Sequence, residues 1–552
     1  MTDRTAEITT TPGTTWNRIK SFSISSIWQG FIAHLNWRIV LIGIALFTMF
    51  VVFLAAIQFS TPNLAGNDGY YHIKYAYLMR TEGLKPAFDW LPLTVLNAQE
   101  FVDHHFLYHV MLIPFTFGDL REGIKVASVL FPALSFLSIW WLLRSQKVPY
   151  AAVWSLGLLV ISEAFLFRMI MPRAQSVSLL FLVWSLYFLL NHKYKWLLPL
   201  GFFYVWLYNA FPLLLVVVVT YIVAAALLEK QICWQPLAYA AAGVGLGLIV
   251  NPYFPENLYF IYRHIAPKLG DPTATSVGSE WYPYKTTQLM ENSGPTLAAF
   301  MAGVTALGLS KRRMHTNTAT SLFLVFIFGY LVFQSRRFIE YAPPIMLIFT
   351  TFAAAPLLMN WLDKKDLLGE QKRSFLQGWI PPKLAEFISG SAWRAWVLVG
   401  VMVVVLVPSM FINLSASRKS LESSAKPYTR YEGASAWLRE NSAPGSRVFQ
   451  TDWDDFPRLF FYNTYNTYTL GLDPTYMQLY DADLYDRWVD ITKGKIDSPS
   501  DAIRDEFGGA YVISDLKHNN FLAKAEDDSN LIEVYRDEGS VVLQVLGVEN
   551  AD

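Results

Sequence analysis

Long apolar runs separated by short polar stretches occupy most of the chain. An α-helix rises 1.5 Å per residue and the hydrocarbon core of a bilayer is about 30 Å thick, so about 20 apolar residues are needed to cross it. The runs predict about eleven transmembrane helices, within a range of about 10 to 13. They cover residues 39–59, 122–143, 150–167, 175–190, 196–208, 211–228, 233–250, 296–309, 319–334, 339–361 and 394–413. The pattern therefore predicts a mainly α, polytopic membrane protein.

Polar segments at both ends and two long loops complete the pattern. Residues 1–37 lack the short apolar core and small-residue cleavage site of a signal peptide, so the run that follows them is predicted to be a membrane anchor. Residues 418–552 alternate helix-like and strand-like pieces, which predicts a small C-terminal α/β domain. Between these segments, residues 38–417 form the predicted transmembrane domain, with long loops at 60–121 and 251–295.

Lysine and arginine residues mark one side of the predicted membrane. Loops after the even-numbered helices are basic, for example Lys311–Arg313, and they lie on the same side as Arg18 and Lys20. The positive-inside rule then predicts a cytoplasmic N-terminus, and it puts both long loops and the C-terminal domain outside the plasma membrane. Within the first long loop, the apolar stretch 106–117 is too short to span, which predicts an interfacial or re-entrant helix.

Composition narrows the function classes. Of the 552 residues, 53% are apolar and 16% are charged, against about 25% charged in soluble proteins, so an ordinary soluble enzyme is excluded. Basic and acidic residues both number 44, which gives no electrostatic reason to expect a nucleic-acid partner. With Cys233 as its one cysteine, the chain can build neither a disulfide framework nor a cysteine-based zinc site.

Acidic and histidine residues cluster in the first long loop. Asp68 follows the first helix in the sequence NDGYYH, where a turn or a helix cap would also explain a lone aspartate. The sequence FVDHHFLYH adds Asp103, His104, His105 and His109 to the same loop. His105 and His109 would share a helix face at a spacing that can hold a metal ion. Rings that anchor the loop at the headgroup level are the alternative explanation.

Arginines lie unusually close to the predicted hydrocarbon region. Arg168 and Arg173 flank the junction of the third and fourth helices, where a charge normally faces a water-filled cavity or an opposite charge. Arg336 and Arg337 begin the tenth helix on the outer side, against the positive-inside bias. The guanidinium fork suits phosphate. Snorkelling side chains or a local ion pair with Glu340 are simpler explanations.

Two further clusters lie on the same predicted face: Glu280 and Trp281 in the second long loop, and Trp453 and Asp454 in the tail. Independent turns and anchors would not all gather on one side. Together the clusters supply carboxylates for a base or a metal, arginines for phosphate, and apolar helices for a lipid chain. This combination favours an enzyme acting on a lipid phosphate at the outer membrane face. A transporter or flippase for an anionic lipid-linked substrate is the alternative, although the sequence shows no internal repeat.

The order of these features resembles the GT-C glycosyltransferases, and within them the catalytic subunit of oligosaccharyltransferase of the single-subunit bacterial and archaeal type. The likeness rests on NDGYYH in the first outer loop, SVGSE in the late loop, an arginine opening a late helix, and DWDDF in the tail. It implies transfer of a sugar or oligosaccharide from a polyprenyl phosphate or pyrophosphate to a protein or glycan acceptor. MPRAQ, however, replaces the family's paired acidic motif, and DWDDF lacks the leading Trp and the Tyr-Gly of WWDYG.

The resemblance and the chemistry of the clusters together assign roles to the candidate residues. The roles are catalysis for Asp68 and Glu280, donor-phosphate binding for Arg168, Arg173, Arg336 and Arg337, and acceptor binding for Trp281, Trp453 and Asp454. The family likeness implies a divalent Mg²⁺ or Mn²⁺ ion held by Asp68 and Glu280, with Asp103 or His105 in place of the missing acidic pair. The missing acidic pair instead predicts weak or absent metal dependence, with Arg168, Arg173 and Arg337 neutralising the leaving phosphate, and the metal site is the competing possibility.

Overall fold

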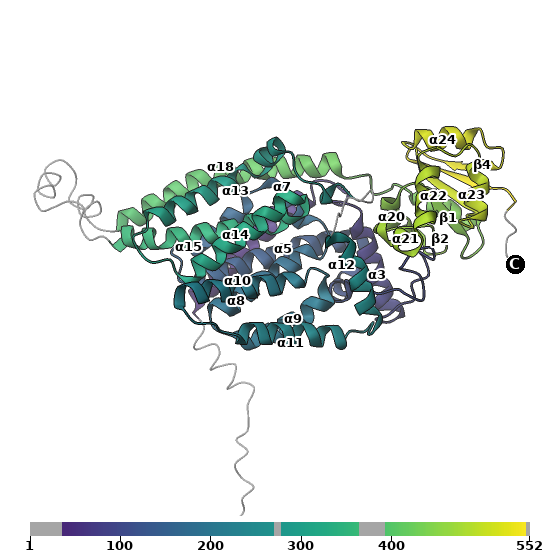
Figure 1. Ribbon diagram of the computed structural model, residues 1–552. Helices are drawn as coiled ribbons and strands as arrows, with labels where there is room; N and C mark the ends of the chain where they lie inside the picture. The colour runs from purple at the N-terminus through teal and green to yellow at the C-terminus, as the bar shows by residue number, and fades with distance from the viewer. Residues whose placement is uncertain (1–35, 270–277, 364–391, 548–552) are drawn as a thin grey trace, which may run out of the picture.

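A helical bundle and a small sheet domain lie at opposite ends of an elongated molecule (Figure 1). The computed structural model describes residues 36–269, 278–363 and 392–547. Helix α18 (Ala392–Ser424) runs along the bundle and past residue 417 toward the sheet domain. The mainly α class with a small C-terminal α/β unit is confirmed.

The bundle is built from the apolar runs found in the sequence. Its longer helices are α2 (Trp37–Gln58), α5 (Leu120–Ser145), α8 (Gln175–Leu190), α9 (Leu197–Leu207), α10 (Pro212–Glu229), α11 (Gln235–Ile249), α12 (Glu256–Leu269), α13 (Thr286–Leu309), α14 (Thr316–Gln334), α15 (Ala342–Asp363) and α18. Shorter elements are α3 (Asp68–Glu82), α4 (Phe106–Leu112), η1 (Ile113–Thr116), α6 (Ala151–Leu156), η2 (Gly157–Leu159), α7 (Glu163–Ile170), η3 (Tyr194–Trp196), η4 (Ser279–Trp281) and η5 (Arg336–Glu340). Each predicted run falls on one or more of these elements.

The predicted number of spans is not confirmed. In the described part of the chain, six helices are long and apolar enough to cross a membrane: α2, α5, α10, α14, α15 and α18. A seventh is added if α6 and α7, bent by 82°, count as one broken span. The bend arises where the Ser162 side chain accepts a hydrogen bond from the Phe165 amide and starts a new helix. With 16 residues, α8 covers only about 24 Å, less than the bilayer core.

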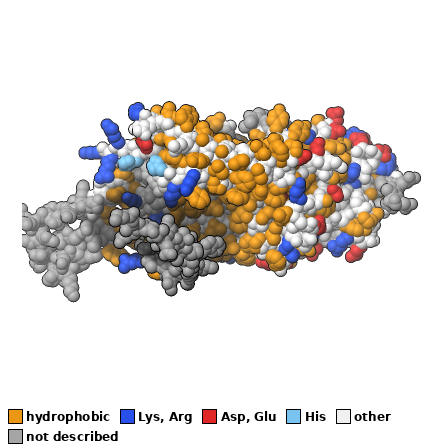
Figure 2. Space-filling view, turned by 90° about the horizontal axis from the view of Figure 1, so that it is seen from below, with side chains coloured by type: hydrophobic (Ala, Val, Ile, Leu, Met, Phe, Trp, Pro, Cys, Tyr) orange, Lys and Arg blue, Asp and Glu red, His pale blue; other side chains and the backbone are white. Residues whose placement is uncertain are grey.

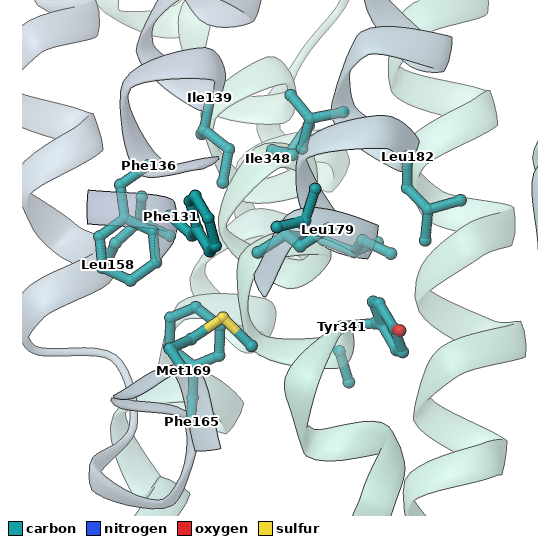
Figure 3. Close-up of a cluster of buried hydrophobic side chains, with 14 of the residues drawn as sticks. Phe131, Phe136, Ile139, Leu158, Phe165, Met169, Leu179, Leu182, Tyr341 and Ile348 are labelled. Atoms are coloured by element: carbon teal, nitrogen blue, oxygen red, sulfur yellow. The ribbon is translucent and has the colours of Figure 1, made fainter. Parts of the chain in front are cut away.

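An apolar core holds the central helices together (Figure 3). Side chains from α5, α7, α8 and α15 meet there, and the rings of Phe136 and Phe165 stack 5.5 Å apart. Ser178 is paired within this core, because its hydroxyl lies 2.9 Å from that of Tyr341 and 2.5 Å from that of Tyr204. The dispersion contacts between the apolar side chains of this core are individually weak but numerous. They fix α7 and the start of α15, the two segments next to the predicted arginines.

A broad apolar belt covers the outside of the bundle (Figure 2). Exposed apolar side chains lie along α2, as at Leu41 and Val52, and along α18, as at Val404 and Phe411. Charged side chains are concentrated toward the two ends, with both signs at the end formed by the C-terminal domain. An exposed apolar surface of this extent identifies a multi-pass membrane protein.

The C-terminal domain is a five-stranded mixed sheet with helices around it. Its strands are β1 (Arg447–Gln450), β2 (Thr467–Tyr468), β3 (Tyr511–Asp515), β4 (Leu531–Arg536) and β5 (Ser540–Val545), and its helical elements are α19 (Glu432–Asn441), η6 (Trp453–Asp455), α20 (Phe456–Tyr462), α21 (Thr475–Tyr480), α22 (Ala482–Thr492), α23 (Pro499–Asp505) and α24 (Asn519–Glu526). The strand order is β2-β1-β3-β5-β4, with β1 parallel to β2 and β3, and β5 antiparallel to β3 and β4. Successive residues of β1, Val448 and Phe449, point to opposite faces and enter different apolar clusters, because both faces of the sheet are covered.

The long loop at 60–121 joins the domain to the bundle. Trp90 donates its indole N–H to the Thr464 carbonyl at 2.8 Å, and its own carbonyl accepts the Tyr468 amide at 2.8 Å. The ring of Phe460 lies 4.9 Å from that of Trp90 and 5.7 Å from that of Tyr71 on α3. These contacts seat α20 against α3 at the end of the bundle (Figure 1).

Candidate active site

A cavity of about 530 Å³ opens where the bundle meets the C-terminal domain. Its lining includes nine of the residues predicted from the sequence: Asp68, His105, Arg168, Arg173, Glu280, Trp281, Arg337, Trp453 and Asp454. The chain separates these residues by nearly 400 positions, yet α3, α7, η4, η5 and η6 bring them to one place.

Close backbone approach brings Asp68 to Arg173. Asp68 is the first residue of α3, and Gly69 packs against the turn at Pro172 so tightly that an added Cβ would lie 2.2 Å from the proline Cγ. A side chain at position 69 would therefore push the two segments apart. The approach places Nε of Arg173 2.7 Å from Oδ2 of Asp68.

Glu280 is the centre of the charge cluster. Its Oε2 lies 2.7 Å from Nη1 of Arg168 and 2.7 Å from Nη1 of Arg173, and its Oε1 lies 3.5 Å from Nη1 of Arg337. Burial alone would raise the pKa of Glu280, but the three guanidinium charges hold it well below its usual range. Glu280 therefore remains a carboxylate.

The three arginines differ in how fully they are paired. Arg168 is held by Glu280 and also donates from Nε to Glu340 at 2.7 Å, and Glu340 is 1% exposed. Arg173 is shared by Asp68 and Glu280. Arg337 makes only the longer contact to Glu280, donates from Nη2 to the Tyr208 hydroxyl, and lies 4.8 Å above the ring of Trp281. Arg337 is therefore the least neutralised cation of the three.

Arg336 points away from the cavity, although the sequence groups it with Arg337. Its Nε donates to the Pro283 carbonyl at 3.2 Å, and its guanidinium lies 5.3 Å from the ring of Tyr284. Successive residues of a 3₁₀-helix point about 120° apart, so neighbours in η5 cannot face the same cavity. The structure therefore separates Arg336 from the other predicted phosphate ligands.

Asn67 connects the acidic tail motif to α3. Its amide nitrogen donates to Oδ2 of Asp454 at 2.6 Å, while its amide oxygen accepts from Nε of the buried Arg458 at 2.8 Å. Partial burial, opposed by Lys426 and reinforced by nearby carboxylates, raises the pKa of Asp454 to about 7. Asn67 was not predicted as a site residue from the sequence, although its place next to Asp68 could have marked it.

The remaining predicted metal ligands, Asp103 and His105, contact other residues than Asp68 and Glu280. Oδ2 of Asp103 lies 2.8 Å from Nδ1 of His109, and Nε2 of His109 lies 2.8 Å from Nδ1 of His72. Asp103 thus faces His109, while the His105 ring stacks on Tyr208 with centroids 5.4 Å apart. His72 was not singled out from the sequence. Its position four residues after Asp68, on the same helix face, is the signal that could have found it.

Comparisons with solved structures identify the architecture. No family model and no curated protein sequence matches the chain. The structure superposes on an oligosaccharyltransferase from Archaeoglobus fulgidus with a TM-score of 0.61 and 13% identity, covering 92% of this chain and 74% of that one. The same archaeal enzyme, AglB, in complex with an inhibitory peptide and a dolichol-phosphate gives a TM-score of 0.61 and 12% identity over the same shares. The chain has a GT-C glycosyltransferase fold.

A second GT-C structure agrees over the whole chain. ArnT from Cupriavidus metallidurans, bound to undecaprenyl phosphate, matches with a TM-score of 0.55 and 15% identity, covering 94% of this chain and 100% of that one. The expected GT-C architecture is thereby confirmed at the level of the fold.

The family likeness implies a divalent ion, and the described residues do not form a fitting site for one. Within the described residues, no three His, Cys, Asp or Glu side chains come together as a group that could hold a metal. The predicted ligands Asp68 and Glu280 both contact the guanidinium of Arg173 instead. A cation cannot bind between two carboxylates that already share a permanent positive charge without displacing it. The predicted set of Asp68, Glu280, Asp103 and His105 is therefore not assembled.

Proposed function

We propose that this protein is a membrane glycosyltransferase that moves a sugar or oligosaccharide from a polyprenyl-phosphate or polyprenyl-pyrophosphate donor to a protein or glycan acceptor. The observation that carries the proposal is the position of Arg337, an incompletely neutralised guanidinium that lines the cavity at the end of the bundle. A fork of this kind binds phosphate oxygens in pairs. The dolichol-phosphate in AglB and the undecaprenyl phosphate in ArnT support a lipid phosphate as its ligand.

The proposed reaction is displacement at the anomeric carbon. A bond forms from the acceptor oxygen or nitrogen to that carbon, and the bond to the phosphate oxygen breaks, leaving its electron pair on the phosphate. Arg337 would stabilise the charge that develops there, because a preorganised cation in a dehydrated site favours the transition state over the ground state. Arg168 and Arg173 support it through Glu280, to which both are bound.

The proposed acceptor site lies on the opposite wall. Trp453 and Asp454 line the cavity from η6, and Trp281 lines it from η4, with its ring 4.8 Å from the Arg337 guanidinium. A carboxylate whose pKa is near neutrality can accept a hydrogen bond from an acceptor hydroxyl or amide. Asp68, held by Arg173, would orient the acceptor at the junction of the two walls.

No divalent ion takes part in the proposed reaction. Arg173 supplies a fixed positive charge between the two carboxylates to which the family likeness assigns the ion. The arginines would then neutralise the leaving phosphate directly. This choice follows from how the cavity carboxylates are paired.

We also propose an orientation, with residues 1–37 cytoplasmic, residues 38–417 as the transmembrane domain and residues 418–552 on the outer side. A Cys233→Ser background with a single cysteine at exposed Arg313 or exposed Lys495 tests it. An impermeant maleimide should label position 495 in intact cells and position 313 only after lysis. The reverse pattern would overturn the orientation.

Transfer itself is tested in proteoliposomes that hold the full-length protein. The probe is polyprenyl-phosphate-linked sugar, radiolabelled in the sugar and extracted from the membranes of the producing cells, together with protein and glycan from the same cells. We expect label to move from lipid to acceptor while free polyprenyl phosphate appears. Movement of intact labelled lipid between leaflets without cleavage would identify a flippase and contradict the proposal.

A further inference from the structure

Three side chains of the first long loop form a hydrogen-bonded chain that ends at the cavity. Asp103, His109 and His72 are joined by two contacts of 2.8 Å, and their exposed fractions are 4%, 0% and 4%. Of these three residues, His72 lines the cavity. The proposed reaction has so far used none of them.

For neutral rings, the hydrogen-bond partners assign one tautomer to each histidine. A carboxylate can only accept, so Nδ1 of His109 carries the proton that faces Asp103. In neutral His109 the other nitrogen, Nε2, must then accept from Nδ1–H of His72. The two nitrogens of an imidazole diverge, so Nε2 of His72 faces away from His109 and keeps its lone pair. The hydrogen bonds among the three side chains therefore orient Nε2 of His72 as a basic nitrogen.

The surroundings keep His72 uncharged before reaction. Burial, together with the neighbouring His109, Arg173 and His104, lowers the pKa of His72 well below its usual range. Asp68, one turn earlier on α3, also lines the cavity, but it is already engaged with Arg173. The Asp68 carboxylate is thus already shared with a guanidinium, whereas the hydrogen bond to His109 uses only Nδ1 of His72 and leaves Nε2 as the nitrogen that can take a proton.

We propose that His72 is the general base that takes the proton from the acceptor during glycosyl transfer, with His109 and Asp103 as its positioning residues. This role rests on the proposed function. The acceptor's proton passes to Nε2 of His72 while the acceptor's electron pair forms the bond to the anomeric carbon and the phosphate leaves. The imidazolium that results is stabilised through His109 by the buried negative charge of Asp103. Balance requires no further reactant.

A purely structural role gives a different expectation for the same residues. Asp103 and His109 already satisfy each other, and Asp103 also accepts the His105 amide at 3.0 Å, so the loop would hold without a third member at the cavity. A packing role would make His72 variants unstable, whereas a base role would slow catalysis in a folded protein. The two roles are therefore separable by experiment.

The test compares His72→Gln and His72→Ala with His315→Gln, a matched change at an exposed histidine outside the site. In the proteoliposome assay, we expect kcat of both His72 variants to fall by about 10²- to 10⁴-fold, with the donor KM unchanged. Added imidazole should restore a measurable part of kcat in His72→Ala and none in His72→Gln, whose side chain fills the space. His315→Gln should behave as wild type.

Asp103→Asn tests the positioning residues. It should lower kcat less than His72→Ala does, and imidazole should not rescue it, because His72 is still present.

Two outcomes would overturn the base role of His72. If wild type transfers the sugar and His72→Gln does so with undiminished kcat, the base role is wrong while the proposed function stands. The base role is also wrong if His72→Ala loses kcat at a normal unfolding temperature and added imidazole restores none of it. An inactive wild type that still binds undecaprenyl phosphate would instead count against glycosyl transfer itself.

Discussion

The two walls of the cavity differ in charge. The wall formed by the bundle presents Arg168, Arg173 and Arg337 together with the carboxylates of Asp68 and Glu280, whereas the wall formed by the C-terminal domain presents Asp452 and Asp454 without a lining arginine among the described residues. Guanidinium groups remain charged at every physiological pH, while the pKa of Asp454 lies near neutrality. In the proposed function, the bundle wall would hold the donor phosphate and the domain wall would hold the acceptor through a hydrogen bond. A site with this polarity suits two substrates that meet between the walls.

The largest effect is expected where the walls meet. Asp68→Ala should reduce transfer by about 10³-fold, because it removes the carboxylate that orients the acceptor beside the donor. Arg173 keeps its contact to Glu280, so the unfolding temperature should stay close to that of wild type. Transfer kinetics and thermal unfolding of the same preparation check both statements.

Asp89→Ala is the matched control for this change, since Asp89 is an exposed aspartate of the same loop. It should leave transfer unchanged. An active Asp68→Ala protein would mean that the NDG sequence only forms a turn, and the meeting point of the walls would need another orienting group.

A comparison of Arg337→Ala with Arg336→Ala tests which arginine of the bundle binds the donor. Arg337→Ala should lower kcat by about 10²-fold and weaken binding of undecaprenyl phosphate, because it removes the least neutralised arginine of the bundle wall. Arg336→Ala removes the adjacent arginine, which donates to Pro283 outside the cavity, and should change transfer little. Equal losses in the two variants would show that general surface charge, and not the cavity, attracts the donor.

The domain wall should respond to pH where the bundle wall does not. Burial and the neighbouring carboxylates raise the pKa of Asp454 to about 7, so the acceptor-binding carboxylate is mostly protonated at pH 6 and mostly ionised at pH 8. The acceptor KM should therefore fall by about tenfold between these values. In Asp454→Asn this dependence should vanish. A wild-type KM that is constant across the range would remove Asp454 from acceptor binding.

Chelation should have the smallest effect. Because Arg173 supplies the positive charge between Asp68 and Glu280, EDTA is expected to leave the rate of transfer unchanged. The measurement is transfer in metal-free buffer, with added Mg²⁺ and Mn²⁺ as the comparison. Loss of activity with EDTA and its return with either ion would show that Arg173 moves aside for a metal when substrates bind.

Local patterns in the sequence were enough to predict most of the fold. Each apolar run became a helix, because apolar length and helix formation are both local properties of the chain. The number of spans could not be derived in this way, because several apolar runs form helices too short to span, such as α8 with 16 residues, and the run at 150–167 is broken at Ser162. In the C-terminal domain, the alternation of helix-like and strand-like pieces predicted the α/β class but not the strand order, because β1 pairs in parallel with β3, a strand far away in the chain.

The site was predictable where a short motif marked it. Asp68, Glu280 and Arg337 stand in recognisable sequences, and the structure brings all three to the cavity. Their pairing was not predictable, because it joins residues far apart in the chain, as Asn67 joins Asp454 across 387 positions. The same reason explains why Asp103 was assigned to a metal: a short sequence shows which ligands are near one another, and not which partner each of them faces.

The central claim is that the bundle wall binds the donor phosphate and the domain wall binds the acceptor. A structure of the full-length protein with undecaprenyl phosphate tests this claim most directly. The account predicts density for the phosphate within hydrogen-bond distance of the Arg337 guanidinium, with the lipid chain against the apolar helices and the wall at Trp453 and Asp454 left open for an acceptor. Phosphate bound at Lys426, beside the acidic motif of the C-terminal domain, would contradict the account.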